Sequence, residues 1–301
     1  MTTTTAIRTA RLYADLALLV AAALWGVAFL FQKSATVHLG PLAFVAARCA
    51  VAAVALAPLA LREARGAPSA GPSFHAMAAA AGAAFLVAAW LQQAGIETAT
   101  VTNTGFLTAL YVVITPFIAW AWGARAPGLI VWPAAGLSVL GTLLLGGGTL
   151  GAFAPGDRLV ALSAVFWALH VVLTAHASHF ARPIGFTALQ LAVVAALAAT
   201  GSLLLEAPTA AGLAAAAFDI LFVGLLSTAL SFTLLTVALQ HAPPSEAAVI
   251  LSAETVFAAL AAYLVLGERL SALGWAGALL ILAAILLVQV GPALALRSPR
   301  P

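Results

Sequence analysis

Residues 38–61 read HLGPLAFVAARCAVAAVALAPLAL and decide the class of fold. The segment is long and apolar enough to cross a bilayer, because about 20 apolar residues in a helix span the hydrocarbon core. Arg48 nevertheless follows Pro41 by seven residues, which places its guanidinium about 10 Å below the outer end of the helix at 1.5 Å per residue. A charge at that depth needs a partner or water.

The rest of the chain is equally apolar. Of its 301 residues, 64% are hydrophobic and only 7% are charged, whereas soluble domains carry about 25% charged residues. Helices satisfy their own backbone hydrogen bonds in lipid, so we predict an all-α integral membrane protein with ten transmembrane helices. Their predicted ranges are 14–32, 41–61, 74–94, 100–122, 129–148, 158–180, 184–205, 215–240, 246–266 and 273–294.

Several function classes are disfavoured by what the sequence lacks. No cluster of Lys and Arg forms a nucleic-acid surface, and the single cysteine, Cys49, excludes disulfides within the chain. The histidines do not have the spacing of metal ligands. The P-loop, HExxH and GxSxG motifs are also absent. We therefore expect no enzyme activity, no cofactor, no metal and no nucleic-acid partner.

The basic residues between the predicted helices indicate the orientation. Cytoplasmic loops carry an excess of Lys and Arg. The side that holds both termini carries Arg8, Arg11, Arg62, Arg65, Arg125, Arg182, Arg297 and Arg300, and the other side carries Lys33, Arg158 and Arg269. The sequence therefore predicts that both termini are cytoplasmic.

The chain also repeats itself at an offset of about 142 residues, so that Trp25 aligns with Trp167 and Pro41 with Pro183. We expect two units of five helices, at residues 1–150 and 151–301. Because five is odd, the second unit enters the membrane from the opposite face. Inverted repeats around a central cavity are a feature of secondary transporters. The expected partners are a small-molecule solute and the bilayer, with the monomer as the functional unit.

Four polar residues within the spans are candidates for gating or charge pairing. Arg48 has Gln190 as its counterpart in the second unit, and Glu246 and Glu254 lie on the ninth span. Arg48 either has a structural role or binds a solute carboxylate. Glu254 either neutralises Arg48, binds a proton or accepts hydrogen bonds from the solute. We predict that Arg48 is paired with Glu254 or with backbone carbonyls.

A larger set of aromatic and polar residues within the spans is predicted to line the cavity. Trp25 and Trp167 occupy equivalent places in the two units, although helix packing is the alternative for both. Trp and Tyr near span ends also serve as interface anchors. The full set is Trp25, Phe29, Trp90, Gln93, Asn103, Tyr111, Trp167, His170, Ser227, Ser231, Ser252 and Glu254.

Three stretches together resemble one transporter family. They are P-x-x-F-x-x-x-R from Pro41, TGFLTALYVVITPF at 104–117 and ETVFAALAAYLVLGERLSALGWAGALLILAAILLV at 254–288. In this order they are similar to the EamA-type, ten-helix branch of the drug/metabolite transporter superfamily. One departure is Thr255, which stands where the second-half signature has proline, while the first half keeps Pro116.

This resemblance implies export of small metabolites, often amino acids, across a bacterial inner membrane. YddG-type exporters of aromatic amino acids are one group to which the chain is similar. We expect substrate to bind between spans 1, 3, 4, 6, 8 and 9, and the halves to rock by alternating access, through facilitated diffusion or proton-linked exchange.

Other functions remain open at this point. Glu254 would also suit an exporter of lipophilic cationic drugs, because such an exporter needs an acid at membrane depth. A nucleotide-sugar transporter would need several basic groups at depth, and only Arg48 is available. The alternatives from a different class are a non-transport membrane enzyme and a scaffold protein.

Overall fold

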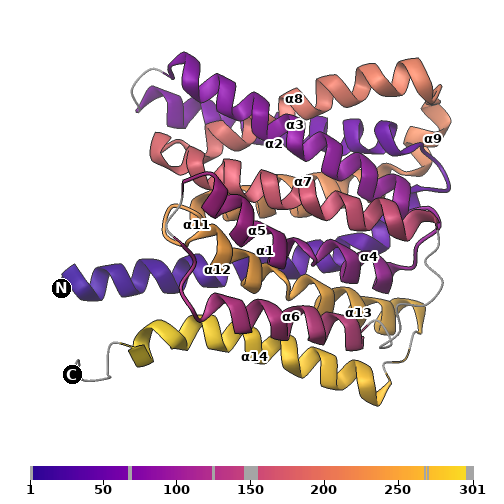
Figure 1. The fold of residues 1–301 in the computed structure, drawn as a ribbon. Helices are drawn as coiled ribbons and strands as arrows, with labels where there is room; N and C mark the ends of the chain where they lie inside the picture. Colours follow the sequence, from indigo (N-terminus) through magenta and orange to yellow (C-terminus); the bar gives the residue numbers. More distant parts are fainter. Residues whose placement is uncertain are drawn as a thin grey trace.

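The computed structural model describes residues 3–66, 70–123, 126–145, 155–267, 269 and 271–295, and in this part of the chain the regular structure is entirely helical. The helices gather into one bundle (Figure 1). The helices are α1 (Thr3–Ala35), α2 (Pro41–Arg65), α3 (Pro72–Ile96), α4 (Val101–Thr108), α5 (Tyr111–Ala121), α6 (Val131–Leu145), α7 (Pro155–Ala177), the 3₁₀ turn η1 (Ser178–Phe180), α8 (Pro183–Leu205), α9 (Ala210–Ala215), α10 (Ala217–Phe222), the π-helix η2 (Val223–Leu230), α11 (Ser231–Ala238), α12 (Pro244–Leu251), α13 (Glu254–Leu266) and α14 (Ala272–Ala295).

Within the described residues, eight of the ten predicted segments are long and apolar enough to cross a membrane. They run over Thr9–Ala35, Pro41–Arg65, Pro72–Ile96, Val101–Ala121, Pro155–Phe180, Pro183–Leu205, Ala217–Ala238 and Pro244–Leu266. The fifth and tenth predicted segments correspond to shorter apolar helices at Val131–Leu144 and Ala272–Leu287. These two helices, α6 and α14, pack against each other. The predicted boundary between residues 150 and 151 lies outside the described residues.

Proline sets the start of several of these helices. Pro41, Pro72, Pro183 and Pro244 each stand in the first turn of a helix, where the amide that proline lacks would have no intrahelical partner. The local sequence therefore fixes where α2, α3, α8 and α12 begin.

The helices α2 and α8 form an antiparallel pair, with the start of each helix beside the end of the other. The Glu206 carboxylate, just after α8, accepts hydrogen bonds from the Leu42 and Ala43 amides at 2.8 and 2.7 Å. The Glu63 carboxylate, near the end of α2, accepts from the Ile184 and Gly185 amides at 3.2 and 2.6 Å. These four amides have no partner within their own helices, so each acid caps the opposite helix.

Two spans are broken near their middle. In the span Val101–Ala121, α4 ends at Thr108 and α5 begins at Tyr111. Pro116 lies within α5, beyond this break, and its missing amide leaves the Val112 carbonyl without its usual helical hydrogen bond.

The break between α12 and α13 forms without a proline. The Ser252 hydroxyl donates to the Val249 carbonyl at 2.6 Å, and the Thr255 hydroxyl donates to the Ser252 carbonyl at 2.9 Å. Such side-chain bonds offer the backbone an alternative to the helical ladder. Thr255, the departure from the family signature, is therefore part of a break in the place where that signature has proline.

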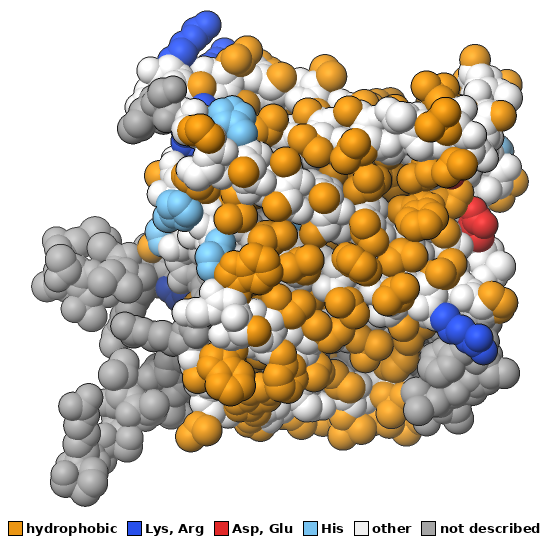
Figure 2. Space-filling model, turned by 45° about the horizontal axis from the view of Figure 1, so that its top comes forward, with side chains coloured by type: hydrophobic (Ala, Val, Ile, Leu, Met, Phe, Trp, Pro, Cys, Tyr) orange, Lys and Arg blue, Asp and Glu red, His pale blue; other side chains and the backbone are white. Residues whose placement is uncertain are grey.

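The surface of the bundle fits a lipid environment. Figure 2 shows hydrophobic side chains over the middle of one face, with Lys, Arg, His and acidic side chains gathered towards its two ends. Soluble monomers rarely expose apolar side chains over so much of one face. The start of α1 and the end of α14 lie at the same end of the bundle (Figure 1).

Candidate solute-binding cavity

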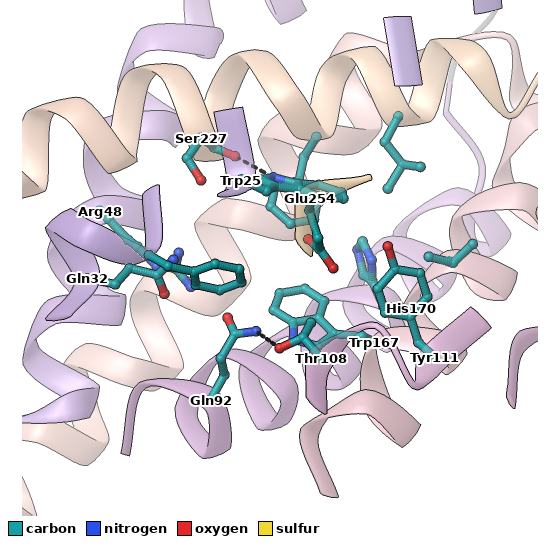
Figure 3. A pocket seen from close by; sticks show the side chains of 14 residues that line it. Trp25, Gln32, Arg48, Gln92, Thr108, Tyr111, Trp167, His170, Ser227 and Glu254 are labelled. Carbon is teal, nitrogen blue, oxygen red and sulfur yellow. Dashed lines mark hydrogen bonds between the residues drawn. The ribbon is translucent and has the colours of Figure 1, made fainter. Parts of the chain in front are cut away.

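A cavity lies inside the bundle and receives side chains from both sequence halves. The cavity is lined by residues from all six of the spans predicted to form it, the first, third, fourth, sixth, eighth and ninth. Arg48 of the second span also lines the cavity (Figure 3). The lining residues are Trp25, Phe29, Gln32, Arg48, Gln92, Thr108, Tyr111, Trp167, His170, Val171, Ser227, Phe232, Leu235 and Glu254.

Aromatic rings form one wall of this cavity. Phe232 lies 4.8 Å from Trp25 and 5.8 Å from Trp167 between ring centroids, and it stacks on Trp167 at an interplanar angle of 22°. These separations are typical of favourable aromatic pairs. The repeat-related tryptophans therefore meet through a shared phenylalanine, and the wall offers a flat apolar surface.

The backbone near the cavity is irregular, and polar side chains form hydrogen bonds at its irregular segments. The Trp25 indole donates to the Ser227 carbonyl at 2.8 Å, and Ser227 belongs to the π-helix η2. A π-helix shifts carbonyls out of the usual i to i+4 ladder and often marks a functional site. At the other broken span, the Gln92 amide donates to the Thr108 hydroxyl at 2.8 Å.

The close approach of α1 to α13 depends on a glycine. A Cβ atom added to Gly26 would lie 2.5 Å from the Glu254 carbonyl oxygen and 2.7 Å from the Ala258 nitrogen. Gly26 follows Trp25 directly, and Trp25 lines the same cavity as Glu254, the first residue of α13.

Arg48 is buried in the cavity wall without a hydrogen-bonding partner for two of its nitrogens. The side chain is 3% exposed, and Nε and Nη2 have no partner within the described residues. Its guanidinium lies 5.9 and 5.8 Å from the rings of Phe44 and Phe85. Contacts at this range contribute about 2 kcal/mol each when desolvated, but they leave the hydrogen-bonding capacity of Nε and Nη2 unused.

Glu254 is the acidic counterpart and is 2% exposed. Its Oε1 atom lacks a hydrogen bond within the described residues. The Tyr111 hydroxyl interacts with the carboxylate electrostatically, but the geometry is not that of a hydrogen bond. Glu254 lies in the first turn of α13, where the helix dipole favours an anion by about 0.3–1 kcal/mol.

The predicted partner of Arg48 is not found. Among the described residues, the ion pairs join Arg11 to Asp15 and Arg11 to Glu246. Nor does Nε or Nη2 of Arg48 donate to a backbone carbonyl. The reason is that α2 packs mainly on α8, whereas α13 packs on α1 and α4, so the backbones that carry Arg48 and Glu254 are held apart across the cavity.

Seven of the twelve predicted cavity residues line the cavity, namely Trp25, Phe29, Tyr111, Trp167, His170, Ser227 and Glu254. The remaining five do not. Trp90 is 41% exposed on the outside of the bundle, and Asn103 donates weakly to Asp157 at 3.4 Å. The other three bond to the backbone: Gln93 to Gln32, Ser231 to Leu226 and Ser252 to Val249.

Gln190 and Glu246 also lie away from the cavity lining. Gln190 is fully buried and its Oε1 lies 2.9 Å from Nε2 of His170, so it holds a lining residue in place. The Glu246 carboxylate pairs with Arg11 at 2.6 Å. Glu246 in α12 is therefore engaged by Arg11, whereas Glu254 in α13 lines the cavity.

Six lining residues are missing from the predicted set, namely Gln32, Gln92, Thr108, Val171, Phe232 and Leu235. Gln92 and Gln93 are adjacent, and neighbouring residues in a helix point about 100° apart, so only one of them faces the cavity. The helical phase relative to Trp25 would be needed to choose between them. Val171 and Leu235 carry no chemical signal in an apolar chain.

Comparison with known proteins agrees with this architecture. The model of the EamA-like transporter family matches the chain twice, at residues 12–147 and 154–290. A relative from Archaeoglobus fulgidus, called an uncharacterized transporter, is 31% identical over 293 residues, which cover 93% of this chain and 87% of the relative. One crystal structure, of a protein described no further, aligns over 95% of this chain and 99% of that one, with a TM-score of 0.75 and 19% identity.

The two repeats, the apolar helical bundle and the shared cavity define an integral membrane transporter. The chain belongs to the EamA-like transporter family. This family lies within the drug/metabolite transporter superfamily that the sequence motifs resemble.

Proposed function

We propose that the protein exports small amphipathic metabolites, foremost neutral and aromatic amino acids, across a bacterial inner membrane by alternating access. The observation that carries this proposal is the cavity between the repeats, whose wall joins aromatic rings to a few buried polar groups. A mostly apolar site with few polar groups is typical of small-molecule binding. The YddG-type resemblance points to the same solutes.

Ten spans in two inverted units, residues 1–150 and 151–301, would give this mechanism its symmetry. The antiparallel pairing of α2 with α8 supports the inversion, because these helices occupy equivalent places in the two repeats. In this topology α6 and α14 are the fifth and tenth spans. Both termini are cytoplasmic by the positive-inside distribution, and the monomer holds a complete cavity.

The irregular segments beside the cavity are the proposed hinges. The breaks at α4–α5 and α12–α13 and the π-helix η2 all contribute lining residues, Thr108, Tyr111, Ser227 and Glu254. Broken helices at mid-membrane are a recurring feature of transporter binding sites, and rocking of one unit against the other changes access around them.

A second candidate is export of lipophilic cations, which the buried Glu254 carboxylate favours. Purified protein in liposomes, supplied with labelled phenylalanine, leucine, threonine and a lipophilic cation, separates the candidates. We expect uptake of phenylalanine and leucine above empty liposomes, and a comparison with and without a pH gradient distinguishes facilitated diffusion from proton-linked exchange. Uptake of the cation alone would replace our proposal by the second, and movement of no solute would favour a non-transport enzyme or scaffold.

A further inference from the structure

Two oppositely charged side chains face the same cavity, and neither is neutralised by the other. Figure 3 shows Arg48 beside Gln32 at one end of the cavity, while Glu254 points into its middle. Each side chain is almost completely buried, and each has polar atoms without a hydrogen-bond partner within the described residues. Buried charges of this kind are normally paired. Arg48 therefore lacks an anionic partner in the cavity, and Glu254 lacks a cationic one.

We propose that Arg48 and Glu254 recognise the two charges of a zwitterionic solute, Arg48 binding its carboxylate and Glu254 its ammonium group. This inference rests on the proposed function. A guanidinium matches a carboxylate through two parallel hydrogen bonds, and a carboxylate accepts from an ammonium. One α-amino acid supplies both partners, whereas a cation or an anion alone would leave one buried charge uncompensated.

The aromatic wall completes the recognition of such a solute. Trp25, Trp167 and Phe232 line the same cavity as the two charged side chains. The ring centroids of the two tryptophans lie within 5.8 Å of that of Phe232. A side chain extending from the α-carbon would lie against these rings. Because the described lining has no further charged residue than Arg48 and Glu254, the site selects apolar side chains over charged ones.

Specificity then depends on both ends of the solute. Phenethylamine keeps the ring and the ammonium of phenylalanine but lacks its carboxylate, and 3-phenylpropionate lacks the ammonium. A site built for a charged group rejects an analogue that leaves its buried partner unpaired. We expect the wild-type protein to prefer phenylalanine over either analogue by at least about tenfold.

The test combines binding, followed by tryptophan fluorescence in detergent, with uptake into proteoliposomes for these three compounds. Arg48→Gln should lose most of the discrimination against phenethylamine and keep that against 3-phenylpropionate. Glu254→Gln should show the reverse pattern, and Arg48→Lys should retain part of the preference. Arg62→Gln and Glu97→Gln remove the same charges at exposed positions and should leave the discrimination between the three compounds as in the wild type.

The outcomes separate this inference from the proposed function. If the wild-type protein binds phenylalanine with the expected preference but moves nothing, export fails and the zwitterion site stands. If phenylalanine is transported but the wild type does not discriminate against the analogues, the inference is overturned. It is also overturned if both variants weaken all three compounds equally. The comparison of the three compounds on the wild-type protein needs no variant. The inference can therefore be overturned even if a variant folds poorly.

Discussion

Glu63 and Glu206 are reciprocal caps, each holding the first amides of the helix to which the other belongs. Removing an N-terminal cap costs about 0.5–2 kcal/mol, so we predict that Glu63→Ala and Glu206→Ala each lower the free energy of unfolding by about 1 kcal/mol. Thermal unfolding in detergent measures the effect. Because the caps lie at opposite ends of the α2–α8 pair, the two losses should add in the double variant.

Arg65→Ala is the matched control for this prediction, because Arg65 is exposed at the end of α2 and caps no other helix. Glu63→Gln keeps an acceptor oxygen and should lose less stability than Glu63→Ala. A Glu63→Ala protein as stable as the Arg65→Ala control would show that the cap contributes nothing.

Gly26 is predicted to be intolerant of any side chain. The nearest atoms to an added Cβ are two backbone atoms of α13 and the Cβ of Phe257, none of which can move aside as the far end of a flexible side chain does. Gly26→Ala should therefore cost about 1–3 kcal/mol, the usual range for overpacking, and should abolish uptake by displacing Trp25 and Glu254. Melting temperature and proteoliposome uptake give the two readouts.

Gly136→Ala provides the comparison, because an added Cβ there meets no atom within 4 Å. It also lies within a helix, α6, where alanine is the better helix former by about 1 kcal/mol. We expect it to leave stability unchanged or slightly improved. An equal loss of stability and uptake from both substitutions would show that Gly26 is not needed for the close approach of α1 to α13.

The broad architecture could be predicted from the sequence because lipid imposes simple rules on it. Apolar length located eight spans, and a two-fold sequence offset located the repeat that the family comparison also finds. Proline at the first helical turn marked where α2 and α8 begin. Each of these signals can be read from a short segment of the sequence or from a comparison of its two halves.

The cavity was harder to predict because it depends on helical phase and on breaks. Trp25 and Trp167 were found through their repeat equivalence, and Glu254 through its charge. Gln92 was missed in favour of its neighbour Gln93, since no sequence signal fixed the rotation of α3. The pairing of Arg48 with Glu254 was wrong because depth along two helices does not give the distance between them.

Lys33 is predicted to secure the C-terminal end of α3. Its ammonium donates to the carbonyls of Ile96, Glu97 and Ala99 at 2.7, 3.0 and 3.0 Å, and cations are favoured at helix C-termini. We expect Lys33→Gln to cost about 1–2 kcal/mol, within the range for hydrogen bonds to a charged group. In Lys33→Gln, amide hydrogen exchange should become faster for residues 93–100 and remain unchanged around the distant cap formed by Glu63. If the substitution left exchange at residues 93–100 unchanged as well, Lys33 would not have this role.

Glu97, in the connection between α3 and α4, should make stability depend on pH. Burial raises the pKa of this carboxyl, the negative charge of Glu206 raises it further, and Lys33 acts in the opposite direction. The folded chain thus binds this proton more tightly than the unfolded chain, so Glu97 favours folding most below its unfolded pKa of about 4.3 and loses that contribution as pH rises through the folded pKa. Glu97→Gln should therefore raise the melting temperature relative to wild type at pH 7 but not at pH 4, and the gain should shrink in a Glu206→Gln background. A gain that is the same at both pH values would show that the ionisation of Glu97 does not affect stability.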